Sequence, residues 1–138
     1  MDNPKDNAEF LDEEYIRINY HEAGFSYLLP EILTLFLEQS AVHLQKLELL
    51  FQQSNLHELS AEAHTLKGSA SSIGATILAN AAQSVEENAE SSNQENLTLM
   101  FNKLKQASES TNIAIAKELK VLSEAENNDL ELSREITF

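Results

Sequence analysis

The sequence predicts an all-α fold, an antiparallel up-down four-helix bundle with an additional short N-terminal helix. Its 138 residues include only 3 glycines and 2 prolines, too few to punctuate the many short strands of an all-β fold. Apolar residues instead recur at spacings of three and four in five segments that short polar or glycine-containing breaks separate. Because such short connections leave no route to parallel neighbours, the long helices should pack antiparallel.

The first two segments differ in length and in the strength of their apolar pattern. The first spans about residues 12–22 and is expected to stop at Gly24. The second begins near Pro30, a residue suited to a first helical turn, and carries the strongest apolar stripe of the chain to about Ser54. We expect the short first helix to lie across one end of the bundle.

Start and stop signals bound the third and fourth segments. Asn55 followed by Glu58 resembles a capping box at the start of the third helix, and Gly74 is placed to end it. The fourth helix spans about residues 76–90 and has an apolar side of its own.

The fifth segment is the longest. Ser92 and Glu95 form an S-x-x-E start signal, and the apolar pattern continues to Leu122, which gives a helix of about 40 Å at about 1.5 Å per residue. The polar run 110–112 could weaken it. The predicted organisation is an N-terminal extension (residues 1–11), the helical bundle (residues 12–126) and an irregular C-terminal tail (residues 127–138).

The charge balance excludes several classes of partner. Nine basic and 23 acidic residues give a net charge of −14, which repels nucleic acid and anionic membranes. The N-terminus lacks the features of a signal peptide, and no run approaches the roughly 20 apolar residues of a membrane span. The absence of cysteine excludes disulfides and thiolate metal sites. We expect a cytoplasmic monomer.

The third helix carries an unusual polar group on its outer face. Its apolar seam includes Ala63 and Leu66, and at about 100° per residue His64 falls about 140° from the centre of that seam. Lys67 falls about 80° away and Gly68 nearly opposite the core. The imidazole, the ammonium and the bare backbone should therefore form one surface patch.

The chemistry of this patch suits a phosphoryl group. A glycine in a helix interior, such as Gly68, lowers helix stability by about 1 kcal/mol relative to alanine. No packing partner is expected on the outer side of the helix to explain why a glycine is present there. Imidazole is a competent nucleophile at neutral pH, and Lys67 can offset the charge of a phosphate on His64. Taken singly, each residue is also compatible with an ordinary solvent-exposed position.

The stretch AHTLKGSASSIGA, residues 63–75, resembles the signature of histidine-containing phosphotransfer (HPt) domains of bacterial two-component phosphorelays. The resemblance covers about residues 12–122 and is closest over residues 61–85. It implies the same helical bundle, with His64 as the phosphorylated residue, Lys67 as its charge-compensating neighbour, Gly68 as the clearance residue and Gly74 as the helix stop.

The resemblance also implies partners. The family takes a phosphoryl group from a receiver-domain phosphoaspartate and passes it to another receiver aspartate, or the reverse. We therefore expect response-regulator receiver domains as partners, together with a hybrid sensor histidine kinase. The chain itself should bind no cofactor or metal, because the receiver supplies the Mg²⁺.

Residues of the fourth helix are candidates to orient the imidazole. Counting from the turn at Gly74 places Glu86 at nearly the height of His64 in an antiparallel pair, where it could hold the Nδ1 proton. Gln83 is the alternative one turn earlier, and Glu86 could also be a solvated surface acid. Ser71 could hydrogen-bond a phosphate or be an ordinary exposed serine.

Other chemistries fit the sequence less well. The stretch HELSAEAH resembles a zinc-protease motif, but Ala61 stands where the second histidine is required. No nucleotide-binding loop is present, so the chain should not be an autonomous kinase. The alternative function is a non-catalytic helical module for protein–protein interaction in which the motif is degenerate.

Overall fold

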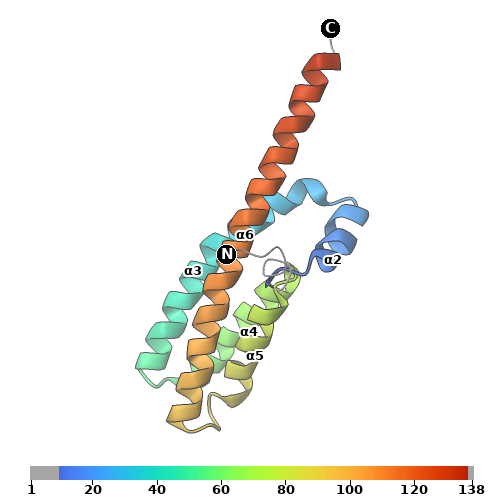
Figure 1. Ribbon diagram of the computed structural model, residues 1–138. Coiled ribbons are helices and arrows are strands. Elements are labelled where there is room, and N and C mark those ends of the chain that lie inside the picture. The colour runs from blue at the N-terminus through green and yellow to red at the C-terminus, as the bar shows by residue number, and fades with distance from the viewer. Residues whose placement is uncertain (1–9, 137–138) are drawn as a thin grey trace.

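The protein folds as a helical bundle (Figure 1). The structure, a computed structural model, describes residues 10–136 and the side chains of residues 10–128; within this range it contains helices and no strand. The long helices α3 to α6 pack in sequence order, and α6 also contacts α3, which closes the bundle. The predicted all-α bundle is confirmed. The long helices are α3 (Leu29–Gln52), α4 (Leu56–Ser72), α5 (Thr76–Asn88) and α6 (Gln94–Ile136).

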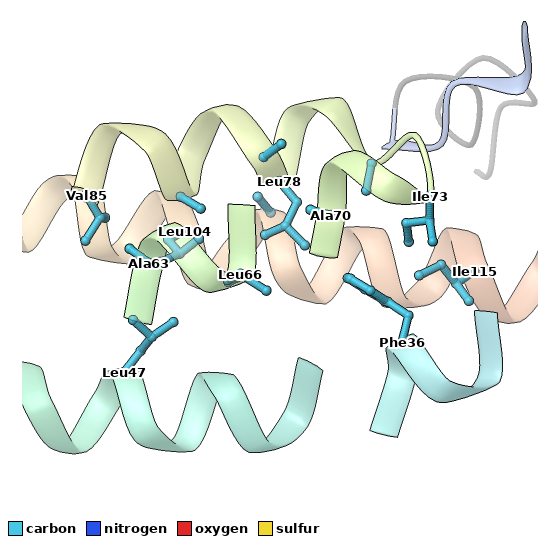
Figure 2. Packing of buried hydrophobic residues seen from close by; sticks show 14 of the residues in the cluster. Phe36, Leu47, Ala63, Leu66, Ala70, Ile73, Leu78, Val85, Leu104 and Ile115 are labelled. Carbon is cyan, nitrogen blue, oxygen red and sulfur yellow. The ribbon is translucent and has the colours of Figure 1, made fainter. Parts of the chain in front are cut away.

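The core is made of the apolar stripes of all four long helices, which meet along the bundle axis (Figure 2). Each large apolar side chain removed from water contributes about 1.5–3 kcal/mol before the entropy of ordering is subtracted. Within the described residues, no helix combines the length and the apolar character that crossing a membrane requires. The large side chains buried most completely include Leu33, Leu47, Leu59, Leu66, Leu78, Leu97, Phe101, Leu104 and Ile115.

The most extensive helix–helix contact joins α4 and α5. Both helices bury alanines, Ala63 and Ala70 on α4 and Ala79 and Ala82 on α5. Small side chains allow two helix backbones to approach closely, so polar side chains on the outer edges of this pair come within reach of one another. This closeness matters for the site described below.

The N-terminal segment covers the turn between α4 and α5 (Figure 1). Helix α2 (Glu13–Ile16) continues into a wider helical turn, η1 (Arg17–Glu22), and a short 3₁₀ turn, η2 (Ser26–Leu28), leads into α3. The carboxylate of Asp12 accepts from the N–H of Tyr15 at 3.0 Å, and the N–H of Asp12 donates to the carbonyl of Gly74 at 2.8 Å. The short helix predicted for residues 12–22, with its stop at Gly24 (φ 86°), is therefore confirmed.

Gly74 must be glycine for two reasons. Its φ is +77°, and a Cβ built there would lie 3.0 Å from Cδ1 of Tyr15. We expect Gly74→Ala to lower the free energy of unfolding by about 1–2 kcal/mol, since an L-residue in this region is strained even without a neighbour. Urea denaturation followed by circular dichroism measures this change. An unchanged midpoint would show that the α4–α5 turn relaxes without cost.

Helix α6 is longer than predicted. It runs for 43 residues, about 65 Å at about 1.5 Å per residue, and projects beyond the other helices (Figure 1). The polar run 110–112 does not interrupt it, because Thr111 is fully buried in the bundle. The prediction of an irregular tail is wrong for residues 127–136, whose backbone is helical; this segment contains no glycine or proline to stop the helix.

Residues 1–9 and 137–138, which belong to the predicted N-terminal extension and C-terminal tail, lie outside the described part of the chain. Leu11, which was assigned to the N-terminal extension, is buried in the core.

The side-chain caps predicted at the starts of two helices do not form as expected. Asn55 precedes α4, but its side chain makes no capping hydrogen bond. At the start of α6 the side chain of Asn93, rather than that of Ser92, accepts from the N–H of Asn96 at 2.8 Å. Asn is as good a helix cap as Ser, so local sequence alone did not distinguish the two.

Candidate functional site

His64 projects from the outer face of α4. Its side chain is 65% exposed, while its sequence neighbours Ala63 and Leu66 are buried in the core. The apolar seam of α4 thus points inward and carries the imidazole to the opposite side, as the helical period predicted. Lys67 follows one turn later, and its side chain is 28% exposed.

Glu86 of α5 joins His64 and Lys67 into one cluster. Its Oε1 lies 2.6 Å from Nδ1 of His64, and its Oε2 lies 2.8 Å from Nζ of Lys67. The hydroxyl of Ser60 donates to the backbone carbonyl of Glu86 at 2.7 Å and fixes the height of α5 against α4. Glu86 is therefore the partner of His64, at the height that counting from the turn predicted.

The cluster sets the tautomer of the imidazole. An ionised carboxylate only accepts hydrogen bonds, so Nδ1 of neutral His64 carries the proton and donates a hydrogen bond to Glu86. The lone pair is then on Nε2, the ring nitrogen that Glu86 does not occupy. Such a carboxylate–imidazole pair fixes the orientation of the ring.

The charge of Glu86 is maintained by its neighbours. The Lys67 ammonium lowers the pKa of the Glu86 carboxyl, and the His64 hydrogen bond adds to this against the opposing effect of burial. Lys67 was expected to act directly on a phosphate. The structure instead pairs its ammonium with Glu86, so in this state Lys67 acts on the imidazole through the carboxylate.

This arrangement predicts a pH dependence of stability. Because the pKa of Glu86 is lower in the folded state, its ionised carboxylate adds to the free energy of unfolding. This stabilisation is fully present above about pH 4.3, the ordinary pKa of glutamate, and is lost as the pH falls through the folded-state pKa. We expect the free energy of unfolding of the parent and of Glu86→Gln to differ at pH 7 and to converge below pH 4. Urea titrations across this range test it; a pH-independent difference would contradict it.

Gly68 lies one turn after His64 on the same exposed surface. A Cβ built at Gly68 would meet no atom within 4 Å, and its backbone is ordinary helix. Nothing within the described part of the chain therefore requires glycine at this position, although glycine costs a helix about 1 kcal/mol. The open space lies outside the folded chain, beside the imidazole.

The remaining candidates are not part of the cluster. The side-chain amide of Gln83 donates to Glu87 at 2.7 Å, so Gln83 does not orient His64. Ser71 lies two turns after His64 on α4 and is exposed, where it remains free to meet a ligand. The sequence reasoning missed a second cluster, made by His43, Lys46 and Glu62, although His43 and Lys46 have the same spacing as His64 and Lys67.

Comparison with known families agrees with this geometry. Among the described residues, no group of three or more His, Asp or Glu side chains is arranged to hold a metal ion. Searches of curated proteins and of solved structures gave no match. The family model of the Hpt domain matches residues 31–131, which include α4, α5 and the complete His64–Lys67–Glu86 cluster. The chain therefore belongs to the Hpt domain family, the histidine phosphotransfer modules of phosphorelays.

Proposed function

We propose that the protein is a phosphorelay intermediate in which His64 accepts a phosphoryl group from a receiver-domain phosphoaspartate and passes it to another receiver aspartate. One observation carries the proposal. The imidazole is mostly exposed, yet its Nδ1 is held 2.6 Å from a carboxylate, so the ring is accessible and oriented at the same time. Lys67 shares this carboxylate at 2.8 Å, whereas at His57, which is also exposed and contacts Glu90, no lysine shares the carboxylate among the described side chains.

The transfer is a single substitution at phosphorus. Nε2 of His64 attacks, the P–O bond of the receiver's acyl phosphate breaks, the receiver carboxylate leaves, and a P–N bond forms. Nδ1 keeps its proton, and Glu86 stabilises the positive charge that develops on the ring. A Mg²⁺ ion held by the receiver would supply positive charge to the phosphoryl oxygens during the transfer. The reverse reaction uses the same groups.

Lys67 has two roles in this proposal. In the resting state its ammonium holds Glu86 in place. An ammonium has three donors, so after transfer Lys67 can also reach a phosphoryl oxygen on His64 without releasing the carboxylate. This local positive charge is useful in a chain whose net charge is −14.

The direct test is phosphotransfer from a receiver. The protein is incubated with ³²P-labelled phosphorylated receiver and Mg²⁺, and the labelled peptide is mapped. We expect an acid-labile, base-stable adduct on His64 that a second receiver removes. Stable binding of the receiver without any transfer of label would favour the alternative, a non-catalytic interaction module. The source of the phosphoryl group is proposed to be a hybrid sensor kinase, and the proposed acting form is a cytoplasmic monomer.

Glu86 is proposed as a positioning residue. We expect Glu86→Ala to slow transfer from the receiver by about 10- to 100-fold, the usual cost of losing a partner that orients a reactive histidine. Glu86→Gln should retain part of the rate, because its amide oxygen can still accept from Nδ1. Rapid-quench measurement of the transfer rate distinguishes these variants.

Glu87→Ala is the matched control for this measurement. Glu87 is the next residue on α5, is exposed, and contacts Gln83 instead of His64. It should transfer at the parent rate. Equal losses in the Glu86 and Glu87 variants would mean that overall negative charge matters and that the contact with His64 does not.

A further inference from the structure

A second cluster of the same composition lies on the other flank of α4. Nδ1 of His43 is 2.6 Å from Oε1 of Glu62, and Nζ of Lys46 is 3.2 Å from Oε2 of the same carboxylate. As at His64, the histidine and lysine are three residues apart on one helix and the glutamate comes from the next helix along the chain. A histidine and a lysine thus share one carboxylate at both places.

The two clusters hold the imidazole in the same way. Because ionised Glu62 only accepts hydrogen bonds, Nδ1 of neutral His43 carries the proton and Nε2 keeps the lone pair. Burial raises the pKa of Glu62, but the contacts with His43 and Lys46 outweigh it, so the pKa ends lowered and the carboxylate stays charged. The features that make His64 a nucleophile are therefore present at His43.

The surroundings of the two histidines differ. The side chain of His43 is only 21% exposed and lines a groove of about 420 Å³ between α3 and α4. Val42 and Glu38 of α3 and Thr65 and Ser69 of α4 form other parts of this groove. A small molecule fits there, whereas the aspartate pocket of a folded receiver needs a ring that projects beyond its surroundings, as His64 does.

We propose that His43 is a second phosphoryl-accepting imidazole, and that it reacts with small N-phosphoryl donors that enter the α3–α4 groove instead of with receiver domains. Lys46 supplies positive charge for the phosphoryl oxygens, and its side chain is 59% exposed, so it can turn toward the groove. Glu38 on the groove wall favours a donor whose leaving nitrogen is protonated. This proposal does not depend on receiver transfer to His64.

The reaction with phosphoramidate balances without another reagent. Nε2 of His43 attacks phosphorus, the P–N bond of the donor breaks, and its protonated nitrogen leaves as ammonia. A new P–N bond forms to Nε2, while Nδ1 keeps its proton and remains hydrogen-bonded to Glu62. The product is a phosphohistidine of the same chemical class as that expected on His64.

The test uses the full chain carrying His64→Gln, which removes the exposed acceptor. This variant is treated with phosphoramidate, and acid-labile label is located by mass spectrometry of its peptides. We expect label on His43, and we expect the double variant His43→Gln, His64→Gln to lose most of it. Phosphorylated receiver should label neither variant.

His57 provides the matched control. It lies on α4, is 82% exposed and contacts Glu90 at 3.0 Å, but no lysine shares that carboxylate among the described side chains. Adding His57→Gln to His64→Gln should leave the label unchanged. An unlabelled His64→Gln variant with parent helicity, or label mainly on His57, would overturn the proposal; the first outcome would leave the His43 cluster as a structural link between α3 and α4.

Discussion

His64→Gln is expected to keep the fold and to accept no phosphoryl group from a phosphorylated receiver. Glutamine has no nucleophilic nitrogen, and among the described side chains no other histidine combines high exposure with a carboxylate shared by a lysine. Because the side chain of His64 is mostly exposed, the free energy of unfolding should change by no more than about 0.5 kcal/mol. Labelling with ³²P-phosphoreceiver and urea denaturation measure the two effects separately.

His57→Gln is the control for this loss. His57 lies two turns earlier on α4, is more exposed than His64 and is also hydrogen-bonded to a glutamate, Glu90, which follows the end of α5. The His57→Gln variant should accept label on His64 at the parent rate, since loss of the His57 side chain leaves Glu86 and Lys67 in place. Undiminished transfer to His64→Gln would reject His64 as the acceptor and with it the proposed function.

The features predicted well are those that follow from regular helix geometry. The turn of about 100° per residue placed the apolar seam of α4 inward and His64 outward, and both positions are confirmed. The rise of about 1.5 Å per residue, counted from Gly74, placed Glu86 beside His64. Such positions can be predicted because α4 and α5 are uninterrupted and the glycine between them makes a short turn.

The features predicted poorly depend on which side-chain contact forms. Sequence left Glu86 and Gln83 as alternatives one turn apart, and only packing shows that Gln83 pairs with Glu87. The pairing of Lys67 with Glu86 likewise depends on the distance between two helices. The His43 cluster was missed because its glutamate comes from α4, so the i, i+3 spacing of His43 and Lys46 in α3 does not by itself show that the two share a carboxylate.

Gly68→Gln is expected to slow phosphotransfer from a receiver by about 100-fold, while Gly68→Ala raises the free energy of unfolding by about 0.5–1 kcal/mol. The folded chain has no atom within 4 Å of the position where a Cβ would stand, so alanine gains helix propensity without a clash. A longer side chain occupies the space beside His64 that an approaching receiver must fill. A displacement of about 1 Å in the reacting groups is enough for a loss of about 100-fold.

A small phosphoryl donor shows whether Gly68→Gln blocks docking of the receiver or impairs the imidazole of His64 itself. Phosphoramidate needs no docked protein, so Gly68→Gln should be labelled on His64 by phosphoramidate at nearly the parent rate while receiver transfer is slow. Ala116→Gln, which places the same side chain at an exposed position of α6, should transfer normally from both donors. Equal slowing with both donors would mean that the new side chain disturbs the His64–Glu86 contact. If Gly68→Ala stabilises the fold while Gly68→Gln slows receiver transfer, the glycine that weakens the helix at this position is explained by docking of the partner and not by the fold.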